Sequence, residues 1–224
     1  MRRTMRDFRS LILVGLVGVG LLAWPATAVA QSVSGSAVAV QGRALGLTTA
    51  LAGTGPLADA LDMREASQME AGILSLGGAD VLHATTGSSV TNWGPSDYVA
   101  SEASLADMDL AVAGNSFSAA FVMARALAPV GGASVATSEI DGLLINGVPV
   151  SVTGQPNQTL PLLGGRVIIN EQVPTSTGTT VNAIHVIIDG LVDLVLASAS
   201  AGANSGGSTS LPPIVPVPPL TRPF

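Results

Sequence analysis

Two histidines are the only side chains of this sequence, apart from its termini, that ordinarily change charge near neutral pH, so acid–base chemistry would have to involve them. His83 lies in GGADVLHATTGSS, close to serines, but no GxSxG or other nucleophile motif accompanies it. His185 lies in TVNAIHVII, where strand alternation places it in one row with Val181, Ala183 and Ile187. We expect His185 to be a partly buried core residue with one hydrogen-bond partner, and we predict no catalytic triad.

Carboxylates spaced two residues apart form two pairs, Asp107 with Asp109 and Glu139 with Asp141. Side chains two apart lie on the same side of a strand, where they could bind calcium or catalyse glycoside hydrolysis. No EF-hand or RTX-like loop surrounds either pair, which favours an exposed polar face. The sequence also contains no cysteine. It therefore predicts no catalytic residue, no bound metal and no cofactor.

Aromatic side chains are scarce, although recognition of sugars and nucleobases commonly uses them. Trp93 and Tyr98 lie together in the loop-like stretch TNWGPSDYV. They are the best candidates for a contact site if the protein has one. We favour the other interpretation, in which Trp93, next to Gly94 and Pro95, caps one end of the core.

The strands that would position these residues begin after residue 30, where the composition of the chain changes. Residues 1–30 contain an arginine-rich start, the apolar run LILVGLVGVGLLAW and the small residues PATAVA, as in a secretory signal peptide. The apolar run is short for a membrane span, so we expect cleavage before Gln31. Residues 31–204 form one predicted domain. Residues 205–224 are a Gly/Ser linker and a proline-rich tail, which favours polyproline conformations.

The charge of the mature chain excludes several kinds of partner. After removal of residues 1–30, five arginines, no lysine and fourteen acidic residues remain, which gives a net charge of −9. So few cations argue against nucleic acid and anionic lipid surfaces. The most apolar later stretch, AIHVIIDGLVDLVLASASA, is interrupted by His185, Asp189 and Asp193, so we expect no transmembrane segment after signal cleavage.

Alternating apolar and polar residues with regularly spaced turn signals predict strands. The pattern covers 32–49, 99–114, 142–154, 166–173, 180–188 and 191–200. Asn146-Gly147 separates two apolar runs and predicts a two-residue hairpin. The expected fold is all-β, an antiparallel sandwich-like single domain. A β-solenoid or a barrel-like sheet is the alternative.

Two segments are rich in helix formers. Residues 55–74 are equally compatible with a short helix beginning at Pro56 and with no helix. For residues 116–130 we favour a long strand, with Phe117, Ala119, Phe121 and Met123 on one face.

Asn157 begins the sequon Asn-Gln-Thr in VSVTGQPNQTL. Asparagine is common in turns because its side chain bonds to nearby backbone, so we expect a turn that joins two strands. A ligand contact and a glycan acceptor are the alternatives.

The ordered series PNQT, NEQ, VNAIHV and ASASAG, within residues 139–203, resembles the core of the choice-of-anchor P family of secreted bacterial surface proteins. SGSAVAVQGRALGL and ASEASLADMDLAVAG resemble its amino-terminal strands. The resemblance implies an exported domain that different members join to different carboxy-terminal anchors, with no established activity. This chain departs from the anchored members because its proline-rich tail has no recognisable anchor.

These features predict a secreted or cell-surface, extracellular protein that is structural or makes interactions without catalysis, with an unknown surface or matrix component as its partner. One alternative is an extracellular binding module for a glycan or a protein. A more distant alternative is a carboxylate-based glycoside hydrolase, with Asp107 and Asp109 as the residues to replace.

Overall fold

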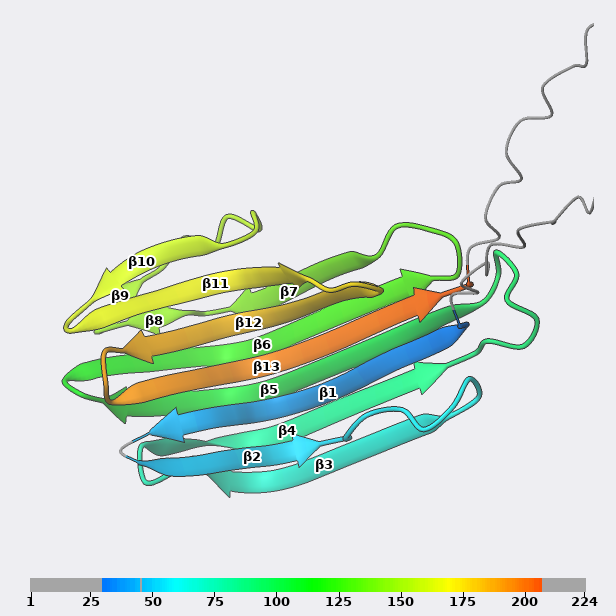
Figure 1. Ribbon diagram of the computed structural model, residues 1–224. Coiled ribbons are helices and arrows are strands. Elements are labelled where there is room, and N and C mark those ends of the chain that lie inside the picture. The colour runs from blue at the N-terminus through cyan, green and yellow to red at the C-terminus, as the bar shows by residue number, and fades with distance from the viewer. Residues whose placement is uncertain (1–29, 45, 207–224) are drawn as a thin grey trace, which may run out of the picture. The chain divides into compact units, whose positions relative to one another are not determined.

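The computed structural model describes residues 30–44 and 46–206, where thirteen β-strands and no helix form two antiparallel sheets stacked face to face (Figure 1). The predicted all-β sandwich is confirmed. The sheets share no strand in this part of the chain, which distinguishes it from a barrel-like sheet. Across the same residues, no helix is long and apolar enough to cross a membrane. The predicted signal peptide and proline-rich tail lie almost entirely outside the described residues.

The first sheet has six strands in the order β10-β11-β12-β13-β1-β2. Their bounds are β1 Ser32–Ala44, β2 Leu47–Gly53, β10 Gln158–Leu162, β11 Gly165–Pro174, β12 Gly178–Ile188 and β13 Val192–Asn204. β1 pairs with β13 from Ser32 opposite Asn204 to Ala44 opposite Val192. The two ends of the described domain therefore lie side by side.

The second sheet has seven strands, of which β3-β4-β5-β6-β8-β9 follow one another and β7 also pairs with β6. Their bounds are β3 Met63–Gly72, β4 Gly77–Ser88, β5 Tyr98–Val112, β6 Asn115–Pro129, β7 Val135–Asp141, β8 Leu144–Ile145 and β9 Val148–Pro149. The Asn146-Gly147 turn joins β8 to β9 with φ of 53° and 72°, which confirms the predicted hairpin. The 116–130 strand is confirmed as β6.

Alanines supply much of the core between the sheets, where β13 packs across β5 and β6. Their small side chains let the sheets approach closely. Ser101, buried on the inner face of β5, donates a hydrogen bond of 2.7 Å from its Oγ to the backbone oxygen of Ser200 in β13. This bond joins the two sheets directly.

The alternation of buried and exposed residues shifts by one along a line of aligned residues that crosses the first sheet and in which every second residue is left-handed. We call this line the switch row; it consists of Ala52, Ala39, Ala197, Ala183 and Asn170, which are aligned across β2, β1, β13, β12 and β11. Every second member, Ala52, Ala197 and Asn170, has φ near +50°. A left-handed residue interrupts the extended chain, so two consecutive side chains point to the same side. Leu196 and Ala197 are accordingly both buried.

A corresponding row crosses the second sheet at Glu70, Asp80, Asp107 and Ala120. Here the consecutive pairs of side chains point outward, as Ala120 and Phe121 do in β6. Phe117 and Ala119 are buried, but burial continues at Val122 and Ala124. The predicted single face containing Phe121 and Met123 is therefore wrong beyond Ala119, because the row changes which side chains face the core.

The possible helix within residues 55–74 does not form. Residues 63–72 are β3, and the preceding loop is fixed by Asp62, whose carboxylate accepts hydrogen bonds from the Ala58 N–H at 2.7 Å and from Arg64 Nε at 2.8 Å. These two bonds lower the pKa of Asp62. Pairing of β3 with β4 outweighs the helix propensity of the segment.

Candidate functional site

A connected set of polar side chains covers part of the outer face of the first sheet. Ser198 donates from Oγ to Asn182 Oδ1 at 2.7 Å, and Asn182 donates from Nδ2 to Glu171 Oε2 at 2.6 Å. The same Glu171 oxygen lies 2.8 Å from Nδ1 of His185, whose Nε2 lies 2.8 Å from Asp193 Oδ1. We call these five residues the His185 network.

Strand register explains why these side chains meet. Glu171, Asn182 and Ser198 are direct cross-strand partners on β11, β12 and β13. His185 lies on the other side of the switch row, opposite Val195, and reaches diagonally to Asp193. The network therefore spans the row in which the alternation shifts.

His185 differs from the sequence expectation. Val181 and Ala183 are buried, whereas His185 lies on the outer face together with Ile187, because the switch row passes between the two halves of β12. The His185 side chain is 15 % exposed and has two carboxylate partners instead of one. The expected partial burial is found, but the predicted place in the core-facing row with Val181 and Ala183 and the single hydrogen-bond partner are wrong.

The chemistry of His185 follows from its partners. Each ring nitrogen has a carboxylate oxygen within hydrogen-bond distance, so a substrate could reach either nitrogen only by displacing Glu171 or Asp193. This geometry is that of a positioning group, which orients Glu171 and Asp193.

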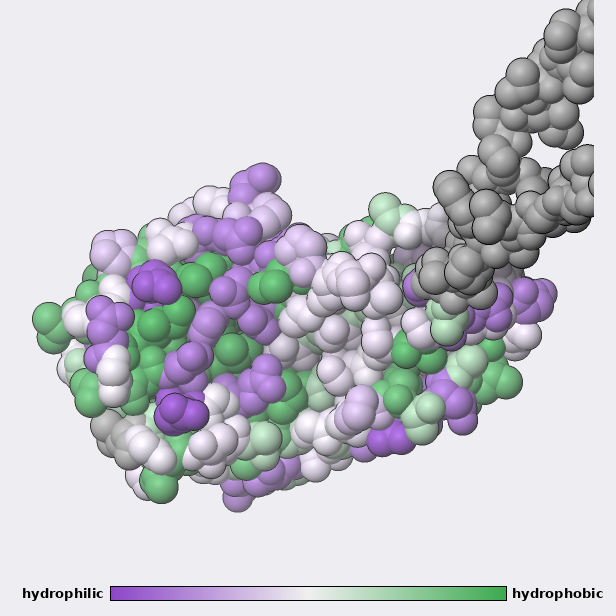
Figure 2. Space-filling view, in the orientation of Figure 1, coloured by the Kyte–Doolittle hydropathy of each residue, from purple (hydrophilic) through white to green (hydrophobic). Residues whose placement is uncertain are grey.

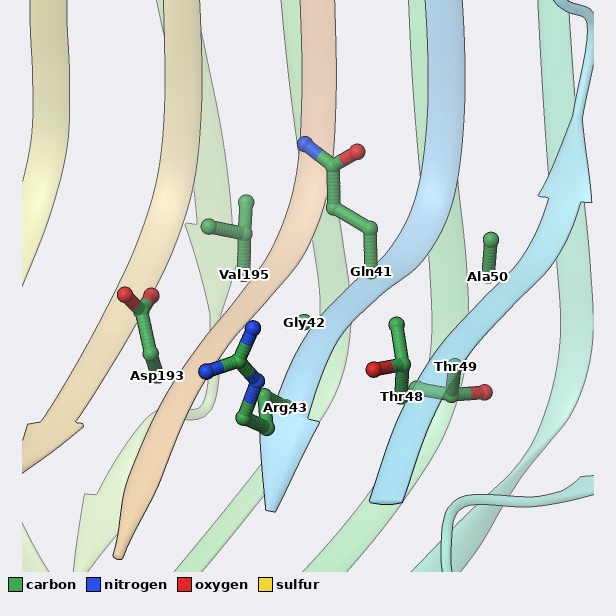
Figure 3. Close-up of a pocket in the computed structure, with 8 residues that line it drawn as sticks. All are labelled: Gln41, Gly42, Arg43, Thr48, Thr49, Ala50, Asp193 and Val195. Atoms are coloured by element: carbon green, nitrogen blue, oxygen red, sulfur yellow. The ribbon is translucent and has the colours of Figure 1, made fainter. Parts of the chain in front are cut away.

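Next to the network, the outer face is hollowed beside β1 (Figure 3). A shallow pocket of about 520 Å³ lies between β13, β1 and β2. Its lining consists of Gln41, Gly42, Arg43, Thr48, Thr49, Ala50, Asp193 and Val195. Figure 3 shows the side chains of Gln41 and Arg43, from β1, and of Asp193, from β13, projecting at the pocket. Asp193 therefore belongs both to the pocket and to the His185 network.

Arg43 is the pocket's cation. Two other arginines of the described residues form ion pairs, Arg64 with Asp62 and Arg125 with Glu102. Arg43 is the cross-strand partner of Asp193, yet within the described part of the chain no carboxylate oxygen lies within ion-pair distance of it. The pocket thus presents a guanidinium and a carboxylate that do not neutralise each other directly.

The face that contains these residues varies in polarity along its length (Figure 2). Charged and aliphatic side chains mix toward the end where β1 stops, and paler, weakly polar residues cover the middle of the view. Ser36, Thr180 and Ser200 lie side by side on adjacent strands of this sheet. Thr180 Oγ1 and Ser200 Oγ are hydrogen-bonded at 3.0 Å.

The predicted contact residues lie elsewhere, at the β4–β5 connection. Trp93 is half-buried with φ of 57°, and Tyr98, the first residue of β5, is exposed. Asp97 holds this loop by accepting hydrogen bonds of 3.0 Å from the N–H groups of Asn92 and Gly94. Burial alone would raise the pKa of Asp97, but these bonds outweigh it and lower the pKa. Trp93 is outside the buried core, and its role as a contact remains a prediction.

The other sequence candidates do not join the network. Asp107 and Asp109 are both exposed on the outer face of the second sheet, where they line a hollow with Glu70 and Asp80. Among residues 30–44 and 46–206, no three potential ligands converge as a metal site would require. His83 Nδ1 lies 3.8 Å from Glu65 Oε1.

Glu139 and Asp141 are both exposed on β7, and neither forms an ion pair among the described residues. Asn157 lies in the predicted turn with φ of 60° and accepts a hydrogen bond of 3.0 Å from the Gln172 N–H. That turn is confirmed, while modification of Asn157 is untested.

Sequence reasoning missed Glu171, Asn182, Asp193, Ser198 and Arg43. One signal was present: Asn182 and His185 are polar residues three apart in an otherwise apolar strand, which lie on one face only if the alternation shifts. No family model, curated protein or solved structure matches the chain. The resemblance to the choice-of-anchor P family therefore stays an expectation.

Proposed function

We propose that this is an exported, non-catalytic protein that acts through contacts made by the outer face of its six-stranded sheet. One observation carries the proposal: His185, the histidine nearest the pocket, has a carboxylate oxygen 2.8 Å from each ring nitrogen. A general base needs a nitrogen available to the substrate, whereas here both are occupied. The same contacts hold Asp193 in place beside the pocket, as a binding surface requires.

The composition supports export. The predicted signal peptide, the absence of cysteine and the proline-rich tail suit a domain held away from a surface. Within that proposal the domain is either a structural component or a binding module. The pocket beside β1 favours the binding module, because it combines charged, amide and hydroxyl groups on rigid strands.

Turnover and location are tested separately. Purified mature protein is incubated with chromogenic glycosides and esters, and we expect no product above the buffer rate. Activity that disappears in Glu171→Gln, Asp193→Asn or Asp109→Asn, with unchanged melting temperature, would overturn the non-catalytic proposal. Fractionation of producing cells should find the protein in the medium or envelope, and a cytoplasmic location would contradict export.

A further inference from the structure

We infer that the outer face of the first sheet contains a groove that binds a linear, uncharged polysaccharide. The inference rests on the proposed contact function and names the ligand class for that same face. Its basis is the shape, the lining chemistry and the charge balance of three adjoining hollows.

The three hollows form one groove along β1. The pocket of about 520 Å³ shares Arg43 and Asp193 with a second hollow of about 470 Å³, which extends past Gly46 to Ile187. It shares Gln41 and Ala50 with a third hollow of about 550 Å³, which extends along β1 to Ser36. Because adjoining hollows share lining residues, we treat them as continuous and call them the β1 groove.

The length of the β1 groove suits a chain molecule. Ser36 and Arg43 are seven positions apart on one strand, which corresponds to about 23 Å at the usual rise of ~3.3 Å per residue. The hollows are open on the solvent side and run along the strand. A compact small molecule would fill only one hollow, whereas an extended polymer can contact all of them.

The lining matches sugar hydroxyl groups. Gln41, Thr48 and Ser36 provide side chains that both donate and accept hydrogen bonds, as each sugar hydroxyl does. Arg43 only donates and Asp193 only accepts when ionised, so the pair suits neighbouring hydroxyls that can do both. Ala50, which is exposed, and the small accessible part of Val195 supply apolar surface for the C–H faces of sugar rings.

The charge of the groove favours an uncharged ligand. The three hollows are lined by one guanidinium, that of Arg43, and two carboxylates, those of Asp189 and Asp193, so they have no excess of positive charge that would hold a polyanion. The mature chain carries a net charge of −9, which repels polyanions such as nucleic acid and acidic polysaccharides. A polycation would be attracted by the chain as a whole but would meet Arg43 in the groove.

The groove is also preorganised. Its residues lie on paired strands, and Asp193, whose side chain is 74 % exposed, is oriented by His185. Fixed polar groups avoid the entropy cost of ordering them when a ligand binds. No aromatic side chain lines the three hollows, so we expect moderate affinity that depends on hydrogen bonds.

Affinity electrophoresis of the purified mature protein tests the inference. The gels contain xylan, glucomannan, hydroxyethyl cellulose or a soluble β-1,3-glucan, and parallel gels contain alginate or heparin. Sedimentation with cellulose and chitin covers insoluble polymers. We expect retardation or co-sedimentation with at least one uncharged polysaccharide and none with the acidic ones.

Variants locate the site. Arg43→Ala and Gln41→Ala should each weaken binding, Arg43→Ala by roughly tenfold or more because it loses charged hydrogen bonds. Arg125→Ala is the matched control, since Arg125 lies on the second sheet and pairs with Glu102. Melting temperatures establish that all variants are folded.

Three outcomes would overturn the inference: no binding to any uncharged polymer, binding only to acidic polymers, or equal binding by Arg43→Ala and Arg125→Ala. None of these outcomes requires turnover, so they leave the non-catalytic proposal intact. Release of reducing ends from a bound polysaccharide would instead overturn the proposed function while retaining the groove.

Discussion

Glu171 Oε2 lies 2.8 Å from His185 Nδ1, on the side of the imidazole opposite Asp193, and the same oxygen accepts a hydrogen bond from Asn182. One carboxylate oxygen thus serves two half-buried donors on the neighbouring strand. The Glu171 side chain is 18 % exposed, so water can bind the two donors only in part once this carboxylate is removed.

Removal of this carboxylate should destabilise the sandwich. We expect Glu171→Ala to lower the free energy of unfolding by about 1–3 kcal/mol, because it leaves the Asn182 amide and His185 ring without their acceptor. Chemical denaturation monitored by circular dichroism measures the change. Glu139→Ala, which removes a carboxylate from β7, is the control and should stay within about 0.5 kcal/mol of wild type. Equal effects of both variants would contradict a structural role for the network.

The β8–β9 hairpin depends on backbone conformation at Gly147, whose φ is 72°. A Cβ at this position would meet no atom within 4 Å, so Gly147→Val tests strain alone. We expect a loss of roughly 1 kcal/mol or more, because a β-branched residue disfavours positive φ. Gly147→Asn should be better tolerated, since asparagine adopts left-handed conformations more readily. Identical melting temperatures for wild type and the valine variant would refute the turn assignment.

Gly42 allows β1 and β13 to approach each other beneath the pocket. A Cβ there would lie 2.2 Å from the backbone oxygen of Asp193, and φ is +150°. We expect Gly42→Ala to destabilise the fold by about 1–3 kcal/mol through overpacking. Gly53→Ala is the comparison, because its nearest neighbour would be Val38 Cγ2 at 3.4 Å. Thermal unfolding of both proteins checks the difference, and an unaffected Gly42→Ala variant would mean that the strands can separate at little cost.

The loop held by Asp97 should weaken in acid. Hydrogen bonds from Asn92 and Gly94 outweigh burial and lower the pKa of Asp97 below its ordinary value of 3.8. A lowered folded-state pKa contributes stability that is present above pH 3.8 and is lost as the pH falls through the folded value. We expect Asp97→Asn to be less stable than wild type at pH 7. This difference should shrink as the pH falls below 3.8 and through the lowered pKa of the folded state.

Thermal melts at a series of pH values, with Trp93 fluorescence as the local signal, measure this convergence. Asp59→Asn, in an exposed loop, serves as the control for general charge effects. A stability difference between wild type and Asp97→Asn that stays constant from neutral to acid pH would contradict the assignment.

Local signals in the sequence determined the secondary structure. Alternation in segments such as 99–114, and an Asn-Gly pair between apolar runs, reflect preferences of neighbouring residues, and these preferences predicted an all-β sandwich with a hairpin at Asn146-Gly147. The strand at 116–130 followed from the same reasoning. Residues 55–74 remained ambiguous because helix propensity competes there with pairing to β4, which is a non-local contact.

Tertiary structure alone decided which side chains share a face beyond the switch row. Ala197 has φ of 53° although alanine has no intrinsic preference for that conformation, so no local signature identifies it. The unfavourable backbone energy of a left-handed alanine is offset only when the aligned strands shift together and bury Leu196 and Ala197 side by side. That shift turns His185 outward, and it assembles the His185 network beside the β1 groove from strands far apart in sequence.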